Sequence, residues 1–174
     1  MKSFPFIVSA ATSALFTQGP ALELLGYHTS VPAGWTTRAP SSSMRLAEFE
    51  IGAKDGTLGA EVVVYFFGKG QGGDVSANRT RWKAQFSEPD GSAVPETVTR
   101  DSAAKFPTTF VEYRGTYRRG VGPGAPPEQA KPNQTLIAAV VETPQGSLFI
   151  QMFGATPNVS AQRAAFTKFV RGLK

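Results

Sequence analysis

Residues 60–67 read Ala-Glu-Val-Val-Val-Tyr-Phe-Phe, the most strongly strand-forming stretch of this 174-residue chain. Nearly every position is β-branched or aromatic, which is typical of a strand in the middle of a sheet. Residues 44–51, just before it, predict a second strand whose side chains alternate between two faces. One face carries Arg45, Ala47, Phe49 and Ile51, and the other carries Met44, Leu46, Glu48 and Glu50. The turn signal Lys54-Asp55-Gly56 between them predicts a hairpin.

Outward from this pair, the glycine-rich residues 68–73 lead into a predicted helix over 75–87, with Asp74 as its N-cap. The buried stripe of this helix is predicted to contain Val75, Trp82 and Phe86. Further strands are predicted at 27–31, 96–102, 110–118, 135–142 and 147–153, with a Gly/Pro loop over 120–133. A last helix begins at Thr156, which is expected to cap it, and has an apolar stripe of Val159, Phe166, Phe169, Val170 and Leu173. Short turns between successive strands predict an α+β fold, a mainly antiparallel sheet with packed helices.

This layout resembles the PsbP-like family, which includes the extrinsic photosystem II subunit and bacterial exported relatives. The matching features are Val31-Pro32-Ala33-Gly34-Trp35, the strand pair at 44–67, the helix after it, and the ending Phe166-Thr-Lys-Phe169-Val170-Arg-Gly-Leu173-Lys174. The resemblance covers about residues 27–174. It implies an α/β/α sandwich on an antiparallel sheet and a binding or assembly module rather than an enzyme. No functional residue can be carried over, because none matches a position here.

The N-terminal residues 1–21 are predicted to be a signal peptide. Lys2 is followed by an apolar stretch, residues 4–16, which has the length of a signal-peptide core and is too short to cross a bilayer. Cleavage is expected after Ala14 or Ala21, which leaves a single α+β domain over 22–174 in the periplasm or the medium. The alternative is an N-terminal core helix. No later stretch reaches the length of a membrane span.

The amino-acid composition excludes several kinds of functional site. The chain has no cysteine, which excludes disulfides, thiol nucleophiles and cysteine metal ligands, and its one histidine is His28. A catalytic triad would have to use His28 with partners that the sequence does not indicate, so we predict no catalytic residue, metal or cofactor. The net charge is +5 and no acidic residue follows Glu142, so the C-terminal helix is basic in the way that suits its dipole.

Three patterns remain as candidates for function. The loop residues Lys69, Gly70, Gly72 and Gly73 precede a helix N-terminus, where free N–H groups favour anions, although Asp74 would compete for those groups and the spacing fits no nucleotide motif. Arg114, Arg118 and Arg119 alternate with tyrosines on a predicted strand, a pattern that also suits nucleic acids. The stretch Arg79-Thr-Arg81-Trp82-Lys83 of the predicted helix has a similar pattern, but Trp82 is expected to be buried there. Export also argues against nucleic acid. Glu48 and Glu50 share a strand face and could serve acid–base chemistry, but solvated carboxylates are the simpler interpretation.

The leading hypothesis is therefore a non-catalytic exported binding or assembly module. Its contact surface is expected in the loops 68–73 and 120–133 and along the edge 114–119, since loops on a rigid sheet commonly carry recognition. The alternatives are a small carboxylate-dependent hydrolase or lyase, and a protein that binds an anionic ligand. Buried, converging carboxylates would favour the first, and a continuous positive surface joining Lys69 to the arginines would favour the second.

Overall fold

An eight-stranded antiparallel sheet forms the centre of the fold. The computed structural model describes residues 19–52, 57–118 and 129–174. Within them the strands lie in the order β3-β4-β5-β10-β9-β8-β6, and β7 pairs with the same edge of β8 as β6 does. The strand bounds are β3 (Trp35–Arg38), β4 (Arg45–Gly52), β5 (Leu58–Tyr65), β6 (Phe86–Ser87), β7 (Glu96–Asp101), β8 (Thr108–Tyr117), β9 (Lys131–Thr143) and β10 (Gly146–Ala155).

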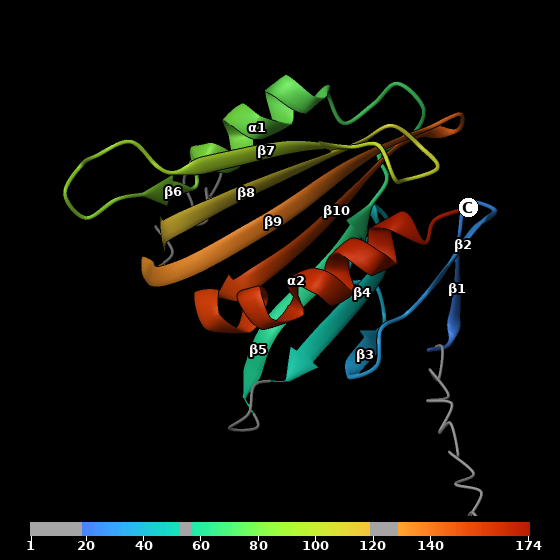
Figure 1. Cartoon of the computed structure of the whole chain (residues 1–174), viewed down its shortest axis with the longest axis horizontal. Helices are drawn as coiled ribbons and strands as arrows, with labels where there is room; N and C mark the ends of the chain where they lie inside the picture. The colour runs from blue at the N-terminus through green and yellow to red at the C-terminus, as the bar shows by residue number, and fades with distance from the viewer. Residues whose placement is uncertain (1–18, 53–56, 119–128) are drawn as a thin grey trace, which may run out of the picture.

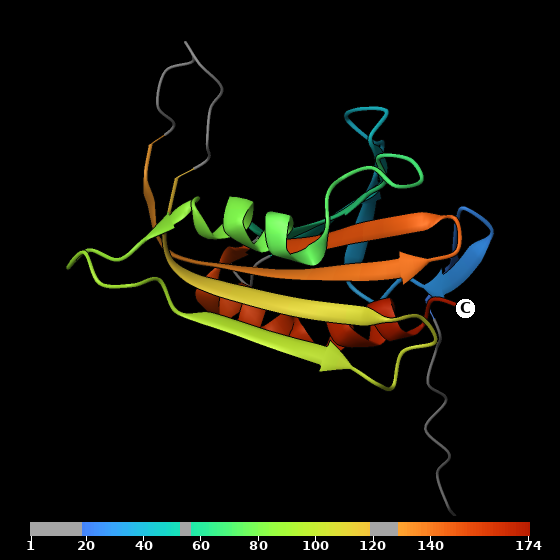
Figure 2. The same cartoon turned by 90° about the horizontal axis from the view of Figure 1, so that it is seen from above.

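Two helices cover opposite faces of this sheet. Helix α1 (Val75–Lys83) lies on one face and helix α2 (Thr156–Arg171) on the other, as Figure 2 shows from above. We call these the α1 face and the α2 face. Since α1 has only nine residues, it covers the β8 side of its face and leaves the side over β5 without a helix (Figure 1).

Each face has its own apolar core. On the α2 face Phe166 and Phe169 pack against buried strand residues such as Val62 and Ile150, and the predicted stripe of this helix is confirmed. On the α1 face Trp82, which is 2% exposed, packs with Tyr113 and Phe149. Because strand side chains alternate between faces, β5, β9 and β10 are apolar on both sides, as expected of central strands.

Three local predictions are wrong. The first helix ends at Lys83 rather than at residue 87, because Phe86 and Ser87 pair with Tyr117 and Thr116 to form β6. The predicted loop over 120–133 is too long, since β9 already begins at Lys131; residues 119–128 lie outside the described chain.

The expected cap of the last helix is also wrong. Ala155 is the N-cap and makes no side-chain hydrogen bond. Thr156 is the first residue of the helix, and its hydroxyl donates instead to the carbonyl of Asn133 at 3.0 Å. By contrast Asp74 caps α1 as predicted, because its carboxylate accepts from the backbone N–H of Ala77 at 2.7 Å.

A separate hairpin, β1 (Ala21–Leu24) with β2 (Tyr27–Ser30), joins the two ends of the described chain. His28 and Lys174 exchange backbone hydrogen bonds of 3.0 and 3.2 Å. The hydroxyl of Thr29 donates to the carbonyl of Phe169 at 2.7 Å. The hairpin is therefore hydrogen-bonded to the C-terminal end of the chain rather than to the main sheet, and its Leu24 is buried in the core of the α2 face.

Candidate functional site

The part of the α1 face that no helix covers contains a groove, which we call the α1-face groove. It consists of two adjoining hollows with volumes of about 630 and 470 Å³, and both are lined by Tyr65, Gln85, Tyr117 and Gln151. The first hollow also includes Phe67, Gln71, Gly72, Arg81 and Trp82. The second extends past Arg45, Glu61, Lys131, Gln134 and Phe153 towards Leu58.

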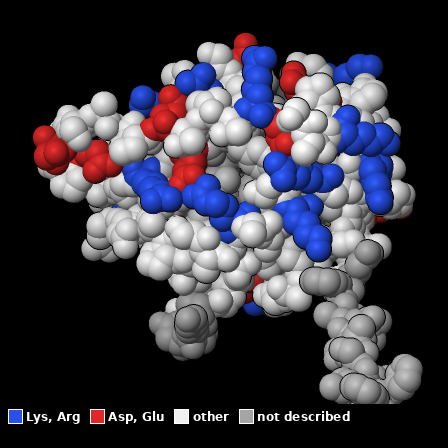
Figure 3. All heavy atoms as spheres, viewed as in Figure 1, with Lys and Arg blue, Asp and Glu red and all other residues white. Residues whose placement is uncertain are grey.

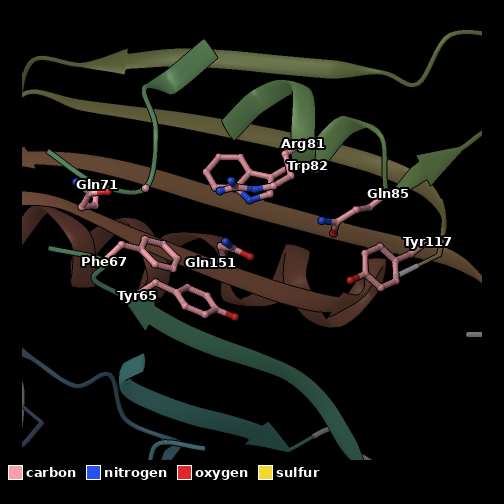
Figure 4. Close-up of a pocket in the computed structure, with 9 residues that line it drawn as sticks. Tyr65, Phe67, Gln71, Arg81, Trp82, Gln85, Tyr117 and Gln151 are labelled. Carbon is pink, nitrogen blue, oxygen red and sulfur yellow. The ribbon is translucent and has the colours of Figure 1, made fainter. Parts of the chain in front are cut away.

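Gln151 occupies the middle of the groove. On the central strand β10 it shares the α1 face with Phe149 and Phe153, and its register partners are Val63 on β5 and Ala138 on β9. Figure 4 shows Gln151 between Trp82 on the helix side and Tyr65 on the β5 side. An amide at this position interrupts an otherwise apolar strand, and packing alone would favour an apolar side chain there.

Three glutamine amides of the groove have no hydrogen-bond partner among the described residues, whereas a fourth, Gln134, donates to the carbonyl of Pro132 at 3.0 Å. The side chains of Gln71, Gln85 and Gln151 make no hydrogen bond to any residue in the described part of the chain. Each amide offers two donors and an acceptor with two lone pairs. No side-chain polar atom of the described residues is both fully buried and unpaired, so these amides reach solvent. They are therefore available to a ligand.

Aromatic rings form the walls of the groove. The rings of Tyr65 and Phe67 are nearly parallel, at 5°, with centroids 6.0 Å apart. Tyr117 packs on Phe153 with a centroid distance of 4.3 Å. The guanidinium of Arg45 lies over Tyr65, 5.4 Å from its centroid. Each of these rings already has a neighbour, and together they offer apolar surface beside the amides.

The glycine loop closes one end of the groove. A Cβ added at Gly72 would lie 2.5 Å from the Phe149 ring and 2.8 Å from Phe67, so the ring walls and the loop are in close contact. The buried amide of Asn78 donates to the carbonyls of Gly72 at 2.8 Å and Asp74 at 2.8 Å, which holds the loop against α1. These contacts support the turn-forming interpretation of the glycines. Gly72 belongs to the groove.

The predicted cations do not lie together. Lys69 lies beside Gly146 at the β9–β10 turn, whereas Arg114 pairs with Thr135 on β9, about 25 Å away along that strand. Arg114 also lies on the α2 face, because it shares Glu112 with Arg163 of α2. Lys69 and Arg114 are therefore not joined by one surface.

The remaining predicted cations differ in how far the structure describes them. Arg118 is exposed just after β8, and its backbone N–H donates to the carbonyl of Gln85 at 2.8 Å. Arg119 lies outside the described residues. Anion binding by any of these residues stays a prediction.

Lysine and arginine side chains gather instead over the α2 side, as Figure 3 shows in the view of Figure 1. Two of the arginines there are held by carboxylates: Arg163 by Glu112 at 2.6 Å and Arg171 by Asp101 at 2.6 Å. Burial raises the pKa of Glu112, but Arg163 and Arg114 outweigh it and hold that pKa below its usual value. This basic surface thus includes structural ion pairs between α2 and the sheet.

Glu48 and Glu50 each have an arginine partner. Arg38 forms an ion pair with Glu50, and Arg45 lies 3.3 Å from Glu48. Glu48 also accepts hydrogen bonds from the backbone N–H and the hydroxyl of Ser41. Burial raises the pKa of Glu48, but the Ser41 bonds and Arg45 outweigh it, so the pKa lies below its ordinary value. A carboxylate held in this state is a poor general acid at neutral pH.

The described residues offer neither a metal-binding cluster nor a helix that could span a membrane. They contain no group of three or more His, Asp or Glu side chains placed to hold a metal ion. His28 is exposed on β2, and its ring makes no hydrogen bond to another described residue. Among the same residues, no helix is both long enough and apolar enough to span a bilayer.

The sequence did not indicate this groove. Its residues come from β4, β5, α1, β8, β9 and β10, and single glutamines carry no motif. One usable signal existed: in the stretch Leu148-Phe149-Ile150-Gln151-Met152-Phe153, a lone amide interrupts an apolar strand. Such an exception indicates either an open sheet face or a bound ligand.

Comparison with known proteins identifies the fold. No family model and no curated protein matches the sequence. Among solved structures, the chain is similar to cyanobacterial PsbP (CyanoP) from Synechocystis sp. PCC 6803. The TM-score is 0.52 with 10% sequence identity, over 97% of this chain and 98% of that one. The chain therefore has a PsbP-like α+β fold, as its sequence predicted.

Proposed function

We propose that this protein is a non-catalytic, exported binding or assembly module whose contact surface is the α1-face groove. The observation that carries the proposal is Gln151, an amide without a hydrogen-bond partner among the described residues, in the middle of a groove with aromatic walls. Ligand sites commonly combine apolar walls with a few polar groups that fix orientation. The PsbP-like fold is compatible with this role but does not choose it, because a fold alone does not determine function.

The geometry argues against the hydrolase or lyase alternative. The candidate carboxylates Glu48 and Glu50 are each engaged by an arginine, and neither lines the groove. A general base or acid for neutral pH needs a group whose pKa lies near 7, which usually means His or a carboxylate shifted upward by burial. Glu48 is shifted downward.

Export is supported by the sequence. Lys2 and the apolar residues 4–16 have the order and length of a signal peptide.

Binding in the groove is tested by NMR titration of the ¹⁵N-labelled chain, read at the side-chain amide signals of Gln71, Gln85 and Gln151. Three probe sets are used: random nine-residue peptide pools, oligogalacturonate and maltohexaose, and oligo-dT. We expect at least one set to shift these signals in the wild type. The response should be lost in Gln151→Leu and kept in the matched control Gln145→Leu, which changes an exposed turn residue. If no probe shifts them, the groove is not a recognition surface.

The non-catalytic part has a separate test. Purified wild type is assayed with esterase, glycosidase, phosphatase and peptidase substrates beside His28→Ala and the double variant Glu48→Gln/Glu50→Gln. We expect no turnover by the wild type. Turnover that disappears in either variant would replace the binding hypothesis with an enzymatic one.

A further inference from the structure

The α1-face groove is long and runs along β5. Leu58 lines one end and Phe67 the other, and these residues are nine positions apart on one nearly extended stretch. At about 3.3 Å per residue this distance is about 30 Å. A groove of that length suits an extended chain rather than a compact small molecule.

The side chains of the groove repeat at the period of an extended peptide. Gln151 and Phe153, which both line the groove, lie two residues apart on the same face of β10. Same-face residues of an extended chain recur about every 7 Å, so a peptide lying along β10 would place alternate side chains between these rows. The amides of Gln85 and Gln151 can each donate and accept, which matches the C=O and N–H groups of a peptide backbone.

The charged side chains that line the groove favour an acidic peptide. The lining includes the cations Arg45, Arg81 and Lys131 and a single carboxylate, Glu61, and Arg45 is already paired with Glu48. Arg81 is exposed, and its guanidinium donates to the Asn78 side chain, which leaves further donors for a ligand. Positive surfaces favour acidic partners, and planar guanidinium groups bind carboxylates well.

The packing of the aromatic rings makes sugars and nucleotides less suitable ligands of the groove than a peptide. Stacking of bases requires free aromatic faces. Here Arg45 lies over Tyr65, Tyr117 packs on Phe153, and Trp82 is 2% exposed. Rings with such neighbours suit contact with the methylene groups of Glu and with aliphatic side chains.

We infer that the groove receives an extended peptide segment of a partner protein, about eight or nine residues long and carrying acidic side chains. This inference rests on the proposed function and names the ligand of the same groove. The glutamine amides bind the backbone of the segment, the ring walls hold its aliphatic side chains, and Arg81 binds one of its carboxylates.

The test selects displayed random nine-residue peptides on the immobilised full-length chain. The selected peptides are then measured against the variants Arg81→Gln and Gln151→Leu. The control is Lys83→Gln, which removes the same charge from an exposed position outside the groove on the same helix. Unchanged denaturation midpoints confirm that each variant is folded.

We expect the selected peptides to contain at least twice the Asp and Glu of the starting library. Their binding should weaken at least fivefold in both groove variants, less than twofold in the control, and progressively with added NaCl. Neutral or basic selected peptides, or equal binding to all variants, would overturn the inference. If oligogalacturonate or oligo-dT shifts the Gln85 and Gln151 amide signals and no peptide does, the peptide inference fails while the groove remains a binding site. If no probe shifts them, both proposals fail.

Discussion

Tyr113 donates its hydroxyl to Glu96 Oε1 at 2.6 Å, which links the central strand β8 to the edge strand β7. The same carboxylate accepts two bonds of 2.9 Å from the guanidinium of Arg79 on α1. Three elements therefore meet at one carboxylate. The hydrogen bonds from Arg79 and then from Tyr113 lower the pKa of Glu96 from 4.5 to about 2.

This cluster predicts a specific acid sensitivity. Glu96 loses its proton more readily in the folded chain, so its contribution to stability is complete above pH 4.5 and is lost as the pH falls towards 2. Glu96→Gln should lower the free energy of unfolding at pH 7 by about 1–3 kcal/mol and flatten its pH dependence between these values. Urea denaturation at several pH values measures this. Glu23→Gln, at an exposed position on β1, is the control and should leave the profile unchanged.

The two cores should respond independently to truncation. Trp82→Ala and Phe166→Ala each remove a large side chain that is at most 2% exposed, on opposite faces of the sheet. We expect each to cost about 3–5 kcal/mol. The double variant should be additive within about 0.5 kcal/mol, because the residues share no partners. Denaturant midpoints measure these changes in the free energy of unfolding. A loss below about 1 kcal/mol in Trp82→Ala would contradict the burial of Trp82.

Two glycines of the loop before α1 provide a matched comparison. Gly70 and Gly72 both have positive φ, +73° and +89°, but a Cβ at Gly70 meets nothing within 4 Å, whereas at Gly72 it meets Phe149 at 2.5 Å. Gly70→Ala should cost about 1 kcal/mol from backbone strain alone. Gly72→Ala should cost about 2–4 kcal/mol because the rings must also move. Equal denaturation midpoints for the two variants would contradict the close contact.

The position of β1 favours one of the two expected cleavage sites in the N-terminal segment. The predicted domain start at residue 22 falls inside β1, where Ala21 pairs with Ser30 and the carbonyl of Pro20 accepts from Val31 N–H at 2.9 Å. Cleavage after Ala14 would keep these contacts, so we predict a mature chain that begins at Leu15. N-terminal sequencing of the native protein checks this. A chain that begins at Leu22 would favour the other site, and an intact Met1 would contradict export.

Strong local patterns were enough to predict the main sheet and the second helix. The run at 60–67 is largely β5, and the spacing of Val159, Phe166 and Phe169 placed the buried side of α2. The strands β3 and β6 were missed because Trp35–Arg38 and Phe86–Ser87 become strands only through pairing with β4 and β8. β1 was missed because it overlaps the end of the predicted signal peptide.

The candidate site was less predictable, for a physical reason. Lys69, Arg114 and Arg118 stood out because they are charged, but charge near a loop or strand does not determine which face it occupies. Once the sheet is formed, Arg114 faces α2 and the groove lies on the other side. Gln85 and Gln151 line one groove only because α1 packs on the β8 side of the sheet, which brings Gln85 beside β10.

The attachment of the β1–β2 hairpin to the end of α2 has a consequence for how the protein is made. Thr29 and its partner Phe169 are 140 residues apart. A ribosome releases the hairpin long before it releases α2, and contacts between such distant parts form late and slowly. The hairpin of a nascent chain can meet Phe106 earlier, because the Tyr27 ring packs on it with a centroid distance of 4.9 Å, but its hydrogen bonds to α2 and Lys174 cannot form until translation is nearly finished. A stop codon just before Phe169 would remove these bonds even though every strand of the main sheet had been synthesised.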